Sequence, residues 1–528
     1  MFFHSWEFLI LLVATAVAYY LPVVCGRRRV WQVSLLLIAS AVFYAWENPK
    51  LLLLLGVSCV INAVAVERIL FWKSKVASSR REGTEKEADA LEQDAPSARE
   101  RHLEHRARRW LVGTVAANLG LLAFFKYAGF IAGWLPEGWM GKSMLEWLRG
   151  IPLPVGISFY TFQGISLVVD TWRRDISPHS MAMIRRRGRD RPASIRDLSF
   201  YISFFPQLVA GPIVKAHDFL DQIGAKRWGD IDWITVRRGL VTGYFLKIFV
   251  ADNLAEQTGV LALGADKVEG MSTVVSMSLL YGYSLQIFAD FAGYSLIAIG
   301  LGALFGYKLP PNFNFPYLST SITEFWRRWH LSLSSWLRDY LYIPLGGNRK
   351  GGGRTYFNLF LVMFLGGLWH GAAWKFALWG SLHGVFLAAE RLVQRGAKSG
   401  EQRLNPRKSS RLRSLFSKLF ACSKWFLTFH LVTLLWLTFM MPDLESIGAF
   451  FHAAGSLRFG FSGPPVFALA FYGTTVVAYH AWGWLSEHRD VLARKLARSP
   501  LEPLCHSLMV FLVVTNPGAP RGFIYFQF

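Results

Sequence analysis

Long runs of hydrophobic residues, separated by shorter polar or basic stretches, dominate this chain. A helix needs about 20 apolar residues to cross a bilayer, and about twelve runs approach that length. The candidate spans are 8–25, 30–46, 51–72, 110–135, 151–169, 199–214, 236–250, 272–305, 357–392, 426–441, 465–485 and 504–515. The pattern therefore predicts an all-α, polytopic membrane protein with about 11–12 transmembrane helices, of which one or two dip into the membrane and return.

Four of these runs are ambiguous. Pro206 and Pro212 interrupt one run, and Lys247 interrupts another. The run 272–305 is long enough for one tilted helix or a broken pair. The run 357–392 is longer still and contains five glycines, which predicts two helices or a re-entrant segment.

Basic residues gather in alternate loops, as the positive-inside rule predicts for the cytoplasmic side. The basic loops are 27–29, 73–109, 173–191, 394–424 and 487–498, whereas 47–50 and 136–149 are poor in basic charge. This alternation places both termini outside the cytoplasm and requires an even number of crossings. The first run lacks the basic region and cleavage site of a signal peptide, so we expect it to remain as a helix.

Composition supports a membrane protein. Of the 528 residues, 53% are hydrophobic, 15% aromatic and 17% charged, and the mean hydropathy is +0.29. The net charge of +22 lies mostly in the predicted loops, so we expect no nucleic-acid partner. The four cysteines, which are Cys25, Cys59, Cys422 and Cys505, lack the spacing of a zinc site or a disulfide framework. We expect no metal and no bound cofactor.

The polar stretch 323–342 is the first candidate for chemistry. Helical spacing would place Trp329 and His330 on one face and Arg328 on another, as in a helix at the membrane interface or beside a wet cavity. The glycine-rich segment that follows, 346–353, lacks the Walker spacing and is most simply a cytoplasmic turn, although it could receive phosphates.

A second candidate is His370, which lies within the run 357–392 between Gly367 and Gly371. An ionisable side chain at this depth is costly and often functional. A neutral histidine bonded to a neighbouring helix is the structural alternative. The tryptophan-flanked His330 strengthens the catalytic interpretation, whereas His383 and the later histidines have no comparable setting.

The third candidate is the terminal segment 523–528, where three phenylalanines surround Tyr525. Such a segment is either an aromatic anchor at the membrane interface or a hydroxyl presented back into a cavity. The motifs of nucleophile-elbow hydrolases, zinc proteases, ATP-driven pumps and dinucleotide-binding enzymes are missing from the sequence. A transporter remains possible, without clear internal symmetry to support it.

Seven motifs together resemble the membrane-bound O-acyltransferase family, in its bacterial branch that serves alginate O-acetylation. They are Phe159-Tyr-Thr-Phe-Gln163 with Val169-Asp-Thr171, Phe204-Phe-Pro-Gln-Leu-Val-Ala-Gly-Pro212, Gln286-Ile-Phe-Ala-Asp-Phe-Ala-Gly-Tyr294, Phe325-Trp-Arg-Arg-Trp-His330, Trp336-Leu-Arg-Asp-Tyr340, Pro344-Leu-Gly-Gly-Asn348 and Gly366-Gly-Leu-Trp-His-Gly371. The charged insert 73–109, most simply a solvated and partly helical loop, is not a feature of the core family.

The resemblance implies a helical bundle around a central funnel in the bacterial inner membrane, with acetyl-CoA as co-substrate on the cytoplasmic side. It implies that His370 and His330 are catalytic. It also implies that Tyr525, in the motif Phe523-x-Tyr525-x-x-Phe528, accepts the acetyl group and passes it to an extracytoplasmic transferase. Arg338, Arg349 and Lys350 are weaker candidates for binding the donor phosphates.

The resemblance also suggests how the chain is divided. Its expected parts are N-terminal helices 1–72, the charged cytoplasmic insert 73–109, the catalytic core 110–392, a basic loop 393–424, C-terminal helices 425–516 and the extracytoplasmic tail 517–528.

The acceptor of a thioester's acyl group needs a base with a pKa near neutrality, and histidine is the usual choice. In this reading His370 removes the acceptor proton, and His330 orients the donor or bonds the developing oxyanion. Which histidine plays which part stays open. The expected function is O-acetylation of an extracytoplasmic polysaccharide such as alginate. Peptidoglycan O-acetylation, teichoic acid D-alanylation, a polysaccharide or lipid transporter, and a membrane scaffold are the alternatives.

Overall fold

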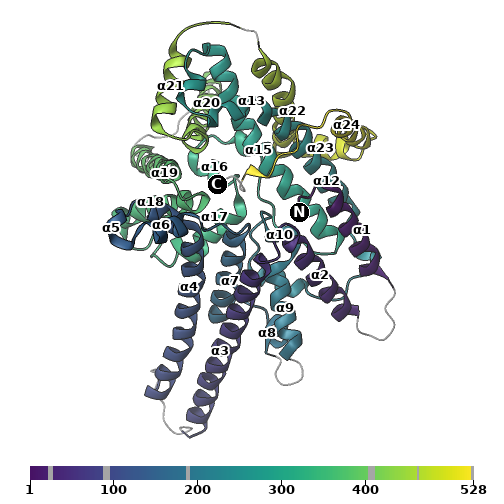
Figure 1. Cartoon of the computed structure of the whole chain (residues 1–528), viewed down its shortest axis with the longest axis vertical. Helices are drawn as coiled ribbons and strands as arrows, with labels where there is room; N and C mark the ends of the chain where they lie inside the picture. The colour runs from purple at the N-terminus through teal and green to yellow at the C-terminus, as the bar shows by residue number, and fades with distance from the viewer. Residues whose placement is uncertain (22–27, 87–95, 186–190, 402–410, 461–462, 525–528) are drawn as a thin grey trace. The chain divides into compact units, whose positions relative to one another are not determined.

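A computed structural model of the chain describes residues 1–21, 28–86, 96–185, 191–401, 411–460 and 463–524. All the regular structure within these ranges is helical, which confirms the predicted all-α class. The chain divides into two compact units (Figure 1). The first unit comprises residues 1–236 and 301–310, and the second comprises 237–300 and 311–528.

The first unit contains the amino-terminal helices. They are α1 (Trp6–Tyr20), α2 (Arg28–Ala45), α3 (Leu51–Lys86), α4 (Ala98–Ala132), α5 (Glu137–Met140), α6 (Lys142–Arg149), α7 (Ile157–Arg173), α8 (Pro178–Ile184), α9 (Arg191–Ser203), α10 (Phe205–Leu208) and α11 (Ala216–Phe219). The predicted span 199–214 is wrong, because α9 ends at Ser203 and α10 has only four residues. Proline lacks the backbone N–H that a helix interior needs, so Pro206 and Pro212 prevent one long helix.

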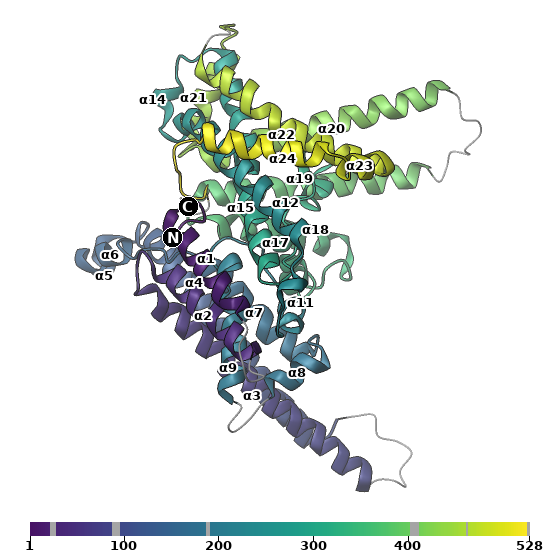
Figure 2. The same ribbon diagram turned by 90° about the vertical axis from the view of Figure 1, so that its right-hand side faces the viewer.

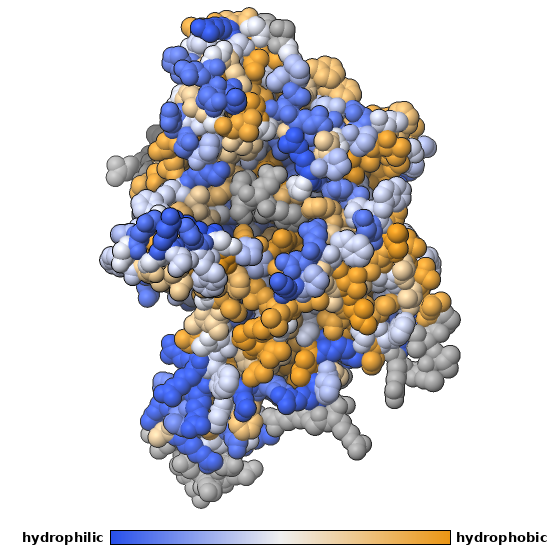
Figure 3. Space-filling model, viewed as in Figure 1, coloured by the Kyte–Doolittle hydropathy of each residue, from blue (hydrophilic) through white to orange (hydrophobic). Residues whose placement is uncertain are grey.

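Helices α3 and α4 form an antiparallel pair that extends well beyond its apolar part (Figure 2). Within the apolar part, the buried amides of Asn62 and Asn118 exchange hydrogen bonds of 3.2 and 3.1 Å. Towards the far ends, Arg80 pairs with Glu100 at 3.2 Å, and hydrophilic residues cover the surface (Figure 3). The described part of the insert 73–109 therefore continues both helices.

The second unit contains most of the carboxyl-terminal helices. Its helices are α12 (Trp233–Tyr244), α13 (Asp252–Thr258), α14 (Ala265–Val268), α15 (Thr273–Leu304), α16 (Ile322–Trp326), α17 (Leu331–Leu337), α18 (Gly351–His370), α19 (Trp374–Glu401), α20 (Arg411–Met440), α21 (Leu444–Gly455), α22 (Pro464–His488), α23 (Asp490–Ala497) and α24 (Leu501–Thr515). Two π-helical segments, Phe245–Ala251 and Arg338–Tyr342, follow α12 and α17. The start of α12 and the end of α15 belong to the first unit.

Four described helices are long and apolar enough to span a membrane, namely Leu51–Arg81, Ala98–Ala132, Thr273–Leu304 and Lys418–Met440. Helices α1 and α24 are apolar but shorter. The apolar window of α15 is 83% buried inside the protein, against 17% for α4. The ambiguous run 272–305 is thus one helix, and it is covered by protein, whereas α4 exposes its apolar side chains as a lipid-facing helix does.

Candidate active site

His370 is the last residue of α18, and only 4% of its surface is exposed. Its ring centroid lies 5.0 Å from that of Trp369, 5.2 Å from that of Trp379 and 5.4 Å from that of Phe439. The extended backbone of Gly371 ends the helix at this point, so the run 357–392 forms two helices as one of its two interpretations predicted. His370 therefore lies at the turn between α18 and α19, inside an aromatic cage.

Close packing of α18 on α19 explains the glycines of this run. A Cβ atom on Gly367 would lie 2.9 Å from Cα of Gly380 and would clash with the carbonyl oxygen of Phe376. Only glycine allows this approach, which holds the His370 turn against α19.

We expect Gly367→Ala to destabilise the protein by about 1–3 kcal/mol, because the new methyl group meets backbone atoms that cannot move aside. The apparent Tm of the detergent-solubilised protein, followed by tryptophan fluorescence, should fall by several degrees. Gly353→Ala, at an open position of the same helix, is the matched control and should leave Tm unchanged or slightly raised. Equal Tm values for the two variants would contradict the packing argument.

His330 lies at a break in the chain and not within a helix. The single helix expected over 323–342 is wrong, since α16 ends at Trp326 and α17 begins at Leu331. His330 has a φ of 45°, in the left-handed region that non-glycine residues rarely occupy. Such strain persists only where surrounding contacts enforce it, and it is concentrated at functional sites.

Asn312 enforces the conformation after His330. Its carbonyl oxygen accepts the Leu331 N–H at 2.9 Å, and its side-chain oxygen accepts the Ser332 hydroxyl at 2.6 Å. Its amide donates to the Ser295 hydroxyl of α15 at 2.9 Å. The buried Asn312 therefore connects the start of α17 to α15 by hydrogen bonds.

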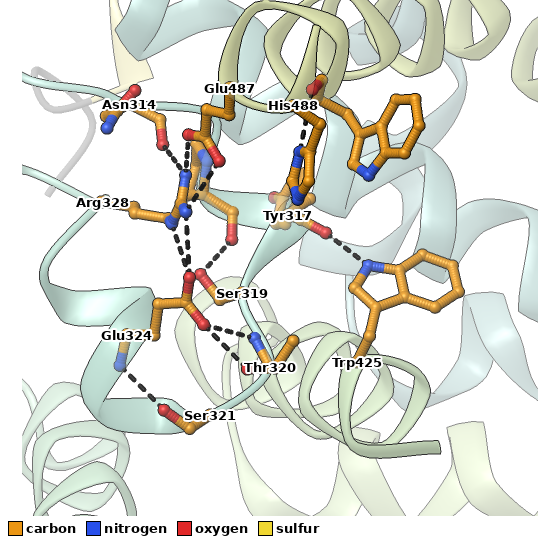
Figure 4. A network of polar contacts seen from close by, with 12 residues as sticks. Asn314, Tyr317, Ser319, Thr320, Ser321, Glu324, Arg328, Trp425, Glu487 and His488 are labelled. Atoms are coloured by element: carbon orange, nitrogen blue, oxygen red, sulfur yellow. Dashed lines mark hydrogen bonds and ion pairs between the residues drawn. The ribbon is translucent and has the colours of Figure 1, made fainter. Parts of the chain in front are cut away.

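Arg328 fixes the conformation before His330 (Figure 4). Its guanidinium pairs with Glu487 of α22 at 2.5 Å and with Glu324 of α16 at 2.9 Å. Its backbone carbonyl also accepts the Asn314 N–H at 2.9 Å. These contacts connect three segments of the second unit and leave His330 little freedom to move.

The two predicted histidines share one aromatic neighbour. The ring centroid of Trp369 lies 6.0 Å from that of His330 and 5.0 Å from that of His370. His330 is fully buried, and the edge of its ring meets Phe291 of α15 at a centroid distance of 4.6 Å. Apolar surroundings disfavour the charged imidazolium, so a neutral ring that can accept a proton is the form this site favours. The structure thus brings His330 and His370 to one aromatic cluster.

His383 belongs to the same aromatic cluster, although the residues around it in the sequence did not predict this. Its Nδ1 accepts the Trp326 Nε1–H at 3.3 Å, and its ring lies 4.7 Å from that of Trp379, a neighbour of His370. This contact gives His383 a part in supporting the cage around His370. Its partners could not be found from spacing, because Trp326 is 57 residues away.

The weaker donor-binding candidates lie at the surface of the second unit. Arg338 is exposed and pairs with Asp339 at 2.7 Å. Arg349 and Lys350 are exposed in the turn before α18. The expected cytoplasmic turn at 346–353 is partly helical, since α18 begins at Gly351.

The C-terminal tail contacts Phe291, whose ring also contacts that of His330. Phe523 is buried, with its ring stacked 4.6 Å from that of Tyr294 and 5.5 Å from that of Phe291. Ile524 is also buried. Tyr525 and Phe528, the rest of the predicted carrier motif, lie outside the described residues. The described tail therefore ends in the aromatic cluster, one residue before Tyr525.

Sequence reasoning missed three buried charges near the tail, which are Lys247, Asp252 and Asp290. Lys247 attracted notice only as an interruption of an apolar run, and Asp290 only as part of a motif. The available signal was an ionisable side chain inside an apolar run, which is costly unless it is paired. Among the described residues, no group of three histidine, cysteine, aspartate or glutamate side chains could hold a metal ion.

Comparisons with known proteins identify the family of the chain. The model of the membrane-bound O-acyltransferase family matches residues 157–434. A probable alginate O-acetylase AlgI from Pseudomonas aeruginosa is 37% identical over 447 residues, covering 84% of this chain and 73% of the relative. A peptidoglycan O-acetyltransferase from Helicobacter pylori is 35% identical over 425 residues, covering 78% and 71%.

A more distant relative is a teichoic acid D-alanyltransferase from Bacillus subtilis, 30% identical over 260 residues that cover 46% of this chain and 60% of the relative. The matched family region includes His330 and His370. The resemblance drawn from the seven motifs is confirmed, and this multi-pass membrane protein belongs to the membrane-bound O-acyltransferase family.

Proposed function

We propose that the chain takes an acetyl group from acetyl-CoA and loads it onto Tyr525, from which an extracytoplasmic transferase collects it. The observation that carries the proposal is the position of the tail. Phe523 and Ile524 are buried, the ring of Phe523 contacts that of Phe291, and Phe291 contacts His330. An aromatic anchor at a membrane interface would not need this burial, whereas a carrier must reach the catalytic group.

In the proposed reaction, the Tyr525 phenol attacks the thioester carbonyl of acetyl-CoA. A C–O bond forms and the C–S bond breaks, so the products are an acetyl-tyrosine ester and CoA. His370 takes the phenol proton and returns it to the departing thiolate. His330 bonds the oxyanion that develops on the carbonyl. The dry cage strengthens both interactions, because water does not compete for the donors.

The acceptor we propose is an extracytoplasmic polysaccharide such as alginate, reached through the partner transferase. Support comes from the names of relatives that cover most of the chain, an alginate O-acetylase and a peptidoglycan O-acetyltransferase. Peptidoglycan is the first alternative acceptor. Teichoic acid D-alanylation has weaker support, since that relative matches less than half of the chain.

The proposed topology places the basic loops and acetyl-CoA on the cytoplasmic side of a bacterial inner membrane. Both termini lie outside, where the carrier tyrosine meets its partner. Arg338, Arg349 and Lys350 are the proposed contacts for the CoA phosphates, since exposed cations suit a soluble, highly charged donor. The lipids of that membrane are the other expected partner of the protein.

Membranes that contain the protein, incubated with acetyl-CoA labelled in its acetyl group, should yield label bound covalently to the chain. Mild hydroxylamine should release that label, as expected of a phenolic ester. Membranes without the protein are the control. A chain that stays unlabelled both alone and with its extracytoplasmic partner present would overturn the carrier step and favour the transporter alternative.

A further inference from the structure

Three buried charged side chains meet where the tail docks on the second unit. The Lys247 ammonium lies 2.8 Å from a carboxylate oxygen of Asp252 and 2.7 Å from one of Asp290. All three side chains are at most 5% exposed. Buried charges are tolerated when they are paired and their hydrogen-bonding groups are used. We call these three residues the charge cluster.

The tail supplies the remaining partners of the charge cluster. Lys247 Nζ donates to the backbone carbonyl of Arg521 at 3.2 Å, in addition to its hydrogen bond with Asp252 and its ion pair with Asp290. The second carboxylate oxygen of Asp290 accepts the backbone N–H of Ile524 at 2.7 Å. The cluster is therefore complete only when the tail is in place.

The two backbone contacts fix both position and register. They hold the tail at Arg521 and Ile524, on either side of Phe523, whose ring stacks on Tyr294. A shift by one residue would move the Ile524 N–H away from Asp290 and move Phe523 out of its stack.

Upstream contacts hold the tail against the π-helical segment and α13 before it reaches the charge cluster. The Gly518 N–H donates to the Ile248 carbonyl at 3.2 Å, and the Ala519 N–H donates to Glu256 at 3.0 Å. A Cβ on Gly518 would lie 2.6 Å from the carbonyl carbon of Asp252, so only glycine fits against this turn. The backbone of the tail thus follows a defined path from α24 to Ile524.

We infer that Asp290 and Lys247 are positioning residues that clamp the tail backbone and thereby set how far Tyr525 reaches toward His330. The clamp itself follows from the contacts above, whereas its consequence for acetyl transfer rests on the proposed function. The clamp binds backbone groups at Arg521 and Ile524 and the ring of Phe523 between them, so it sets the register of the chain without using the side chain of residue 525.

Trypsin reports on the clamp directly, because the bond after Arg521 is the one whose carbonyl Lys247 holds. The full-length protein in detergent would be treated with trypsin, and the C-terminal peptide that begins at Gly522 would be quantified by mass spectrometry. Asp290→Ala removes the Ile524 contact and leaves Lys247 paired with Asp252, so the buried ammonium keeps a carboxylate partner. We expect about tenfold faster release of the peptide.

Two further variants separate clamping from a general loss of structure. Asp290→Asn keeps an acceptor for the Ile524 N–H and should release the peptide at an intermediate rate. Ile524→Pro removes that N–H, leaves every residue of the bundle unchanged and should accelerate release as Asp290→Ala does. Asp266→Ala, which removes an exposed carboxylate of the same unit, is the matched control and should behave as the wild type.

Release at the wild-type rate from both Asp290→Ala and Ile524→Pro would overturn the clamp. The proposed function can fail separately, since a wild-type chain that takes no acetyl label could still show release that depends on Asp290. If both hold, Asp290→Ala should also lower the labelling of Tyr525, and Asp290→Asn should restore part of it. A purely structural role would not produce this graded rescue together with accelerated release.

Discussion

His370→Ala is expected to lower the rate of acetyl transfer to the chain by about 10²- to 10⁴-fold, the usual contribution of a general base. The buried ring lies at the end of α18 among Trp369, Trp379 and Phe439, where water cannot easily replace it as a base. The measurement is the initial rate of label incorporation from acetyl-CoA in membranes containing equal amounts of protein.

His480→Ala is the matched control. His480 is also buried in the second unit, with its ring 4.7 Å from that of Phe288, but its Nδ1 bonds the carbonyl of Val476 on its own helix. Losing it should alter packing and leave most of the activity. Equal loss in both variants would make His370 structural. Activity lost in His330→Ala but kept in His370→Ala would exchange the roles proposed for the two catalytic histidines.

The positions of most helices were predictable, because apolar composition acts locally on each segment, although about twelve spans were predicted and four of the described helices are long and apolar enough to cross a membrane. The glycines of the run 357–392 predicted two helices or a re-entrant segment, and two helices, α18 and α19, are found there. The predicted span 199–214 was wrong, because Pro206 and Pro212 interrupt an otherwise apolar run. Proline lacks the backbone N–H that a continuous helix needs, and this effect decided the local structure there.

His330 was identified as a site residue, but its local structure was not. Residues 323–342 are all compatible with a helix, and nothing local in their sequence marks a break. The break is enforced by Asn312 and by Glu487, which lie 20 and 159 residues from the groups that they contact. Contacts of this kind override local propensity and cannot be derived from spacing.

The charge cluster shows the same limit. Lys247 stood out in an apolar run, yet one of its acceptors, the carbonyl of Arg521, is 274 residues away. A sequence can therefore show that a buried charge needs partners without showing which ones. Here the missing partner proved to be the tail that carries the candidate acceptor.

Tyr525→Phe is expected to remove covalent label from the chain completely, because phenylalanine has no oxygen that can accept the acetyl group. The substitution keeps the aromatic ring, so an anchoring role for the tail would be preserved. Tyr281→Phe, which removes a phenol from a tyrosine stacked on Phe429 elsewhere in the second unit, is the control and should leave the label unchanged.

The same variant distinguishes the carrier from its alternatives in whole cells. A carrier mechanism predicts that Tyr525→Phe abolishes acetylation of the secreted polymer while the protein stays folded in the membrane, with tryptic release of the peptide after Arg521 unchanged. Unchanged release matters because the clamp binds backbone groups at Arg521 and Ile524 and not the side chain of residue 525. Full acetylation of the polymer by this variant would reject the carrier and leave the tail as an aromatic anchor, docked beside His330 for reasons of stability alone.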